Sequence, residues 1–113
     1  MIFIKKEYRI KKEKEIDKVF KAKKSVGNKF FVIYQIKNDE TNHFRFALSI
    51  GKKYGNAVSR NKIKRRIREI IRLNLNLLKN KDYVLVVKPT ARNLNFEEIE
   101  KNILFLLKRE ENK

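Results

Sequence analysis

Apolar residues recur along this 113-residue chain with two different periods, and these periods divide it into helices and strands. Over residues 57–78, isoleucine and leucine recur three or four positions apart, which predicts an amphipathic helix that runs to about Leu78. Gly55 ends the preceding element, and the side chain of Asn56 can accept from the free N–H groups of the first turn. We expect the buried stripe of this helix to consist of Ile63, Ile67, Ile70, Ile71, Leu77 and Leu78.

Three segments have the composition or the alternation of β-strands. Residues 30–36 are almost all β-branched or aromatic, and residues 44–50 alternate apolar with polar or small side chains. A turn-rich loop at 38–42 separates these two segments, so we expect them to form an antiparallel hairpin. Residues 83–87 are apolar on both faces, which favours a central strand that runs parallel to the strand over 44–50.

Two further amphipathic patterns predict the remaining helices. Ile16, Val19 and Phe20 give residues 11–24 a narrow apolar face, and acidic residues come early and lysines late, which suits the helix dipole. Pro89 ends the third strand, and Asn95 with Glu98 can form a capping box that opens a final helix. The core face of that helix is expected to comprise Phe96, Ile99, Ile103, Leu106 and Leu107.

The elements follow the order α-β-β-α-β-α, with room for one extra short strand. This order predicts an α/β (α+β) two-layer sandwich in which three helices pack on a small mixed sheet of three or four strands. Residues 1–113 are expected to form a single domain, because the chain is too short for a second core. Residues 1–9 are expected to be a flexible basic N-terminus.

The net charge of +17 indicates an anionic partner, because a chain this basic repels itself when it is alone. Nucleic acid is the first candidate. A membrane surface is the second, but no amphipathic segment with apolar anchors or lipidation site is evident. No apolar run has transmembrane length and no signal peptide is recognisable, so we expect a cytoplasmic protein that does not bind membranes. The lack of cysteine excludes disulfides, thiol catalysis and Cys-based zinc sites.

The arginines are concentrated in the central helix. Five of the nine arginines lie within the 13 residues 60–72, and Glu69 is the only acid between residues 41 and 81. Lysine and arginine commonly cover a solvated helix face, but this face lacks the acids that would pair with them. Arginine also binds phosphate with two parallel hydrogen bonds. We therefore expect the helix to bind a phosphate backbone through Arg60, Asn61, Lys62, Lys64, Arg65, Arg66, Arg68 and Arg72.

No catalytic or metal-binding set is evident. His43 is the only histidine and lies in a predicted loop, where a solvated surface residue is the usual outcome. Glu97, Glu98 and Glu100 could in principle hold a metal, but acids in the first turns of a helix are already explained by the dipole. The sequence therefore offers binding groups, without catalytic residues or a metal site.

A second binding feature involves aromatic residues. Phe20 and Ile16 on the first helix and Tyr34 on the first strand could line a groove, and aromatic faces flanked by lysine suit the stacking of unpaired bases. Aromatic residues at such positions also commonly just fill a core, so the spacing leaves both interpretations open. Lys52 and Lys53, at the end of the second strand, would continue the positive surface of the helix N-terminus.

Several segments together resemble the bacterial ribonuclease P protein component. Residues 57–65, Ala-Val-Ser-Arg-Asn-Lys-Ile-Lys-Arg, resemble the RNR motif of that family, and 52–55 match the Lys-Lys-x-Gly that precedes it. The similarity extends to Asp17-Lys18-Val19-Phe20, to residues 31–34, and to residues 82–84 ahead of a Lys-Pro pair, and so covers nearly the whole chain.

The resemblance implies a function and two sites. It implies an RNA-binding subunit that assists a catalytic RNA in removing the 5′ leader from precursor tRNA, with Mg²⁺ held mainly by the RNA and no protein partner. The RNR helix would contact the catalytic RNA, and the groove residues Ile16, Phe20, Tyr34, Lys52 and Lys53 would contact the leader. It also implies a left-handed crossover between the parallel strands, contrary to the usual rule.

The chain departs from the family pattern at two positions. Lys62 replaces the second arginine of the motif and loses its forked geometry, and Ile16 stands where an aromatic residue is common. The alternative is a ribosomal, RNA-assembly or DNA-binding protein that uses the same helix, although no helix-turn-helix or dimer seam is evident. A protein nuclease is a third option, but Glu69 alone cannot supply its catalytic carboxylates.

Overall fold

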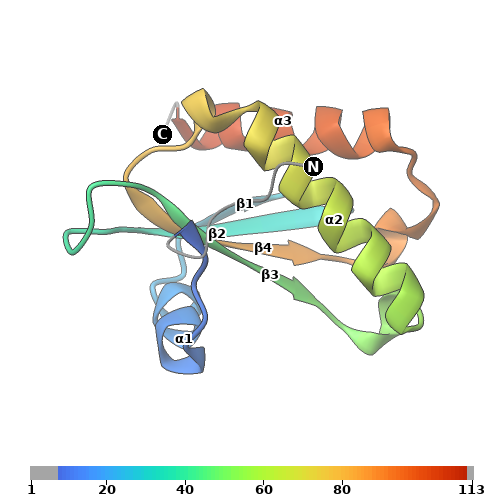
Figure 1. The fold of residues 1–113 in the computed structure, drawn as a ribbon, viewed down its shortest axis with the longest axis horizontal. Coiled ribbons are helices and arrows are strands. Elements are labelled where there is room, and N and C mark those ends of the chain that lie inside the picture. Colours follow the sequence, from blue (N-terminus) through green and yellow to red (C-terminus); the bar gives the residue numbers. More distant parts are fainter. Residues whose placement is uncertain (1–7, 112–113) are drawn as a thin grey trace.

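The computed structural model describes residues 8–111, and side chains over 8–109, as a sheet with helices on both faces (Figure 1). The elements in chain order are α1 (Glu13–Lys21), β1 (Ser25–Gly27), β2 (Phe31–Lys37), β3 (Arg45–Ile50), η2 (Lys52–Tyr54), α2 (Ala57–Leu73), η3 (Leu75–Leu77), β4 (Lys81–Val87), η4 (Pro89–Asn93) and α3 (Phe96–Glu111), where η marks a 3₁₀-helix. The three helices, the mixed sheet and the extra short strand, β1, confirm the predicted α+β class.

The strand order in the sheet is β1-β2-β4-β3. β4 is antiparallel to β2 and parallel to β3, so its predicted central position and its parallel partner are both confirmed. The predicted hairpin of β2 with β3 is wrong, because β4 lies between them. The physical reason is that β4 is apolar on both faces and is best covered at the centre, which leaves β3 at an edge.

The two faces of the sheet are covered unequally (Figure 1). α2 and α3 pack on one face over a large core that includes Phe31, Ile33 and Leu85, whereas α1 packs on the other face over a small cluster around Val19 and Val84. Alternation along each strand explains both clusters, because successive side chains point to opposite faces. α1 thus adds a partial third layer to the expected two and leaves part of its face of the sheet open.

α2 is held by its isoleucine stripe but ends earlier than expected. Ile63, Ile67 and Ile70 are at most 1% exposed. The helix ends at Leu73 instead of about Leu78, because the Asn74 side chain donates to the carbonyl oxygen of Ile70 at 2.8 Å and the Asn74 backbone leaves the helical region. Leu77 and Leu78 still pack at the border of the core from a 3₁₀ turn and the residue after it.

The remaining boundaries follow the sequence signals closely. Asn95 and Glu98 form the predicted capping box, each side chain accepting from the other's backbone N–H at 2.8 and 3.0 Å. Tyr8 stacks on Phe44, and Arg9 forms a β-bridge with Phe46. The rest of the N-terminus that we expect to be flexible, residues 1–7, lies outside the described residues. Among the described helices, none is long and apolar enough to cross a membrane.

Candidate RNA interface

α2 begins at a fixed point next to the end of β3. The Asn56 side chain accepts from the N–H of Ser59 at 2.9 Å, which confirms the predicted N-cap. Tyr54, in the preceding 3₁₀ turn, is only 6% exposed, and burial raises the pKa of its hydroxyl. The cap and the buried tyrosine together fix the position of the first basic residues of the helix.

Most of the predicted RNA-binding side chains on α2 are accessible and lack an internal counter-charge. Asn61, Lys62 and Arg65 are exposed, while the other five, Arg60, Lys64, Arg66, Arg68 and Arg72, are half-buried. Among the five arginines of α2, Arg72 is the one that forms an ion pair with an acid of the described residues. Four of the five helix arginines therefore keep their charge without an internal acid to neutralise it.

Arg72 differs from the other helix arginines. Its Nε donates to Glu69 Oε2 at 3.0 Å and its Nη2 binds Glu69 Oε1, one turn earlier on the same helix. The hydrogen bond from Arg72 lowers the pKa of the Glu69 carboxyl. The Arg72 guanidinium, which we expected to bind RNA, is therefore already paired with an acid of the same helix.

The cations of α2 lie on two sides of the helix. Arg60, Lys64 and Arg68 recur every four residues and share one side, and Lys64 and Arg68 line a hollow with the edge strand β3. Lys62, Arg65 and Arg66 line a shallower surface toward Phe96 at the start of α3. The basic surface therefore wraps around the helix from the edge of the sheet to the first turn of α3.

The predicted aromatic residues are brought together between α1 and β2. The rings of Phe20 and Tyr34 meet edge to face with centroids 4.9 Å apart, and both side chains are half-buried. They pack with Ile16 on the small cluster around Val19. The two rings thus fill part of the α1 interface, as the alternative interpretation allowed, and keep part of their surface accessible.

A row of small and apolar residues continues this face beyond the aromatic pair. Val32, Val86 and Ser49 are register partners on three adjacent strands, and alternation places them on the α1 side of the sheet. All three are half-buried. Lys52 and Lys53 are exposed and follow β3 directly, so they lie past the end of the sheet and not beside Phe20. The five predicted groove residues are therefore spread along this face instead of lining one short groove.

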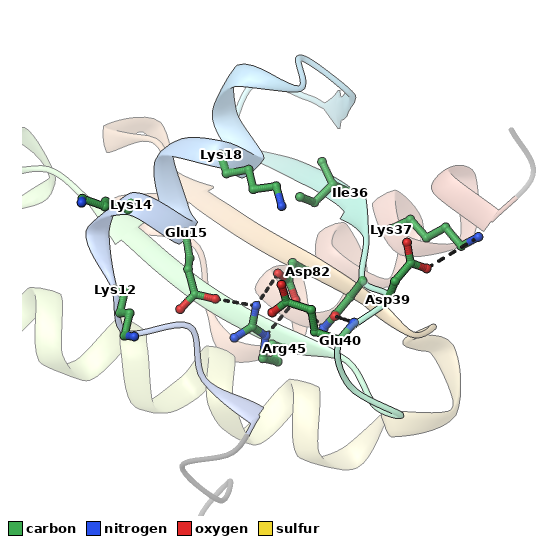
Figure 2. A pocket seen from close by; sticks show the side chains of 11 residues that line it. Lys12, Lys14, Glu15, Lys18, Ile36, Lys37, Asp39, Glu40, Arg45 and Asp82 are labelled. Carbon is green, nitrogen blue, oxygen red and sulfur yellow. Dashed lines mark hydrogen bonds and ion pairs between the residues drawn. The ribbon is translucent and has the colours of Figure 1, made fainter.

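A third feature is a cluster of charged residues at the other end of α1 (Figure 2). Arg45 Nη2 lies 2.7 Å from both Asp82 Oδ2 and Glu15 Oε2, and Arg45 Nε donates to Asp82 Oδ1 at 3.0 Å. The hydrogen bond to Asp82 raises the pKa of the Arg45 guanidinium. The cluster borders a hollow of about 680 Å³ and ties α1 to β3 and β4.

The described residues contain no group of three His, Asp or Glu side chains that could hold a metal ion. His43 is half-buried against Tyr8, with ring centroids 4.6 Å apart, and its Nδ1 lies 2.8 Å from the carbonyl oxygen of Phe44. These are the surroundings of a packed residue at the edge of the core. The expectation that His43 is a solvated surface residue is therefore wrong. The site offers cations and apolar surface for binding.

Comparison with known proteins identifies the family. The family model described as Ribonuclease P matches residues 4–111. The chain belongs to the ribonuclease P protein family. As a family member, it is an RNA-binding subunit of the endoribonuclease that matures the 5′ end of tRNA.

Individual ribonuclease P proteins agree with this assignment. The ribonuclease P protein component of Acholeplasma laidlawii is 50% identical over 105 residues, which are 92% of this chain and 90% of the relative. That of Listeria innocua is 42% identical over 106 residues, or 93% and 89% of the two chains.

Solved structures of ribonuclease P proteins share the fold. The Staphylococcus aureus protein superposes with a TM-score of 0.86 at 38% identity, covering 90% of this chain and 94% of that one. The Thermotoga maritima protein superposes with a TM-score of 0.81 at 31% identity, covering 89% and 96%.

Sequence reasoning missed two groups of residues in this ribonuclease P protein. Arg9 was assigned to a flexible end, although it lies beside Arg68. Arg45, Glu15 and Asp82 are far apart in sequence, and no local pattern joins them. The row Val32, Ser49 and Val86 had a usable signal, because strand alternation alone places these residues on one face.

Proposed function

We propose that α2 docks on the phosphate backbone of the catalytic RNA of ribonuclease P. Seven residues would make the contacts: Arg60, Asn61, Lys62, Lys64, Arg65, Arg66 and Arg68. Arg72 would contribute less than expected, because Glu69 already binds its guanidinium. The observation that carries the proposal is the group of four arginines on one helix that lack an ion pair within the described part of the chain. Like charges held this close repel each other, and a polyanion would relieve that repulsion.

The face of the sheet that α1 leaves open is suited to the single-stranded leader of precursor tRNA. Phe20 and Tyr34 offer ring surface on which a base can stack, and Val32 and Val86 continue an apolar floor. Lys52 and Lys53 stand beyond the floor, where they can neutralise the leader backbone. Ile16 supports this surface through the same cluster but also borders the hollow beside α2.

In this proposal the protein binds and the RNA performs the hydrolysis. Mg²⁺ is assigned to the RNA, because the neighbouring carboxylates of Glu15 and Asp82 already bind Arg45 and do not fit a Mg²⁺ site. The protein neutralises phosphates and so allows catalytic RNA and substrate, both anionic, to approach. Within residues 8–109, the one acid on α2 is Glu69, and Arg72 already binds its carboxylate, which supports this division of labour.

The test is reconstitution with a bacterial catalytic RNA and assay of leader removal at low Mg²⁺. Binding of the catalytic RNA should weaken about 10³-fold or more between 50 and 200 mM salt if several phosphates are neutralised. Arg65→Ala should weaken assembly with the RNA, while Arg109→Ala, an exposed arginine on α3, should not. Salt-independent binding would exclude phosphate docking by α2.

The leader surface has a separate test. Phe20→Ala should weaken binding of precursor tRNA with a long leader and leave binding of leaderless tRNA nearly unchanged, because the leader is the part of the substrate that the ring is proposed to contact. An equal loss on both substrates would contradict the assignment. Purified chain that cleaves precursor tRNA without any RNA component would contradict the division of labour between protein and RNA.

A further inference from the structure

A hollow beside the edge strand carries positive charge from both the N-terminal segment and α2. Its volume is about 250 Å³, several times the share of about 30 Å³ that one water has in the liquid. Of the residues that the structure describes, four cations and no acid line the hollow, and its floor is apolar. The lining residues are Arg9, Lys11, Lys64 and Arg68 with Ile10, Ile16, Phe46, Ala47 and Leu48.

The two arginines of this hollow are held close to each other and are partly desolvated. Burial lowers the pKa of the Arg68 guanidinium, and the charge of Arg9 lowers it further. The Nε atoms of Arg9 and Arg68 are both inaccessible to solvent and have no hydrogen-bond partner. A buried donor that is left unpaired is costly, so this arrangement is unfavourable in the free protein.

Arg45 shows how the same chain treats a cation that is internal to the fold. Its side chain is 16% exposed, and it binds two carboxylates at 2.7 Å. Arg9 and Arg68 have no such partner among the described residues. Since no acid of the described residues supplies it, the contrast favours a counter-charge from another molecule.

We infer that this hollow seats one nucleotide of the catalytic RNA, with its phosphate between Arg9 and Arg68 and its ribose or base on the apolar floor. The inference rests on the proposed function and extends the docking surface from α2 to the N-terminal segment. The guanidinium groups match the geometry of a phosphate, and Lys64 adds a third positive charge. Of the residues assigned to the leader surface, Ile16 lines the hollow but the two aromatic residues Phe20 and Tyr34 do not, and the cations Lys64 and Arg68 belong to α2. The occupant is therefore assigned to the catalytic RNA and not to the leader.

Arg9→Met and Arg68→Met test the seat, because methionine keeps the apolar stem and removes the charge. Each variant should weaken binding of the catalytic RNA, in the absence of tRNA, about tenfold or more. The double variant should weaken binding by less than the product of the two single effects, and its salt slope should fall by about one, because both side chains hold one phosphate. If the salt slope of the double variant falls by about two and the two losses of affinity multiply, the arginines bind two separate phosphates. That result would contradict the proposed site for a single phosphate. A loss confined to leadered tRNA would move the site to the substrate.

The stability of the free protein separates a binding role from a structural one. If the arginines repel each other in the free protein, Arg9→Met should unfold at the same or a higher urea concentration than the wild type. If Arg9→Met instead has a lower midpoint of urea unfolding, and its RNA affinity falls only in proportion to the folded fraction, the role of Arg9 is structural. Arg109→Met serves as the matched control for the loss of one exposed charge.

The same experiments distinguish failure of the phosphate site at Arg9 and Arg68 from failure of the proposed function. If the wild type binds the catalytic RNA and Arg9→Met binds equally well, the seat fails while docking by α2 stands. If the wild type itself does not bind this RNA, the proposed function fails and the seat with it.

Discussion

Arg45 is the arginine that binds two carboxylates, those of Glu15 and Asp82, within the fold. Asp82 is 5% exposed, and its carboxylate receives two hydrogen bonds from Arg45 and one from Asn38 Nδ2 at 2.9 Å. Arg45→Met would remove the charge and both of its hydrogen bonds but keep most of the side-chain volume. The Asp82 carboxylate would then be buried without a counter-charge, a change that typically costs about 3–5 kcal/mol.

The size of the expected effect follows from the length of the chain. With an unfolding entropy of about 2.1 cal/mol/K per residue, a chain of 113 residues loses roughly 4 °C in Tm for each kcal/mol. Arg45→Met should therefore lower Tm by about 12–20 °C. Glu15→Gln should lower Tm by about 4 °C or less. The Glu15 side chain is 30% exposed, so solvent weakens its ion pair, and Arg45 keeps its two hydrogen bonds to Asp82 in this variant.

The assay is thermal or urea unfolding followed by circular dichroism, with Asp82→Asn added to the Arg45→Met background. The second substitution removes the unpaired charge and should recover a large part of the lost stability. A double variant less stable than Arg45→Met would refute the reasoning, as would a Glu15→Gln effect as large as that of Arg45→Met. Either result would mean that packing, and not the buried charge, governs this end of α1.

Two further predictions concern α2. Asn56→Ala should lower Tm by about 4 °C, because an N-cap that accepts from the first turn contributes about 1 kcal/mol; unfolding followed by circular dichroism measures it. Glu69→Gln should destabilise the protein at neutral pH but not at low pH. The pKa of Glu69 is lowered by Arg72, so its stabilisation is present above the unfolded pKa and is lost as pH falls through the folded one. The Tm difference between Glu69→Gln and wild type should narrow from pH 7 to pH 3, and a constant difference would contradict this.

Elements and their caps could be predicted from the sequence because they depend on neighbours in the chain. The isoleucine spacing predicted the position of α2, and Asn56 predicted its start. The apolar character of residues 83–87 on both faces predicted the central strand, which the structure extends back to Lys81. The end of α2 was predicted too late, because the leucines at 77 and 78 continue the helical period although Asn74 ends the helix. The spacing of apolar residues shows which side chains share a face. A 3₁₀ turn can hold side chains on that same face after the α-helix has ended.

Strand neighbours and long-range charge pairs could not be predicted in the same way. Alternation in residues 44–50 assigns each side chain to a face but does not say which strand pairs with either edge. β2 pairs with β4 because the strand that is apolar on both faces is best covered at the centre of the sheet. To identify that strand, all the strands of the fold must be compared. Arg45 and Asp82 are 37 residues apart, and Arg9 reaches Arg68 only because the N-terminal segment runs beside β3.

The treatment of arginine within this fold connects stability to RNA binding. Arg45 is neutralised by the chain's own acids and holds α1 in place, whereas Arg9 and Arg68 keep buried donors that the fold leaves unpaired. A phosphate bound there would satisfy those donors and cancel their repulsion only in the folded state. RNA binding should therefore stabilise the protein by about 2.7 kcal/mol at a free RNA concentration 100 times Kd. We infer that Arg9 and Arg68 repel each other in the free protein. Variants that weaken RNA binding at this hollow should therefore keep or raise the stability of the fold, whereas Arg45→Met should lower it.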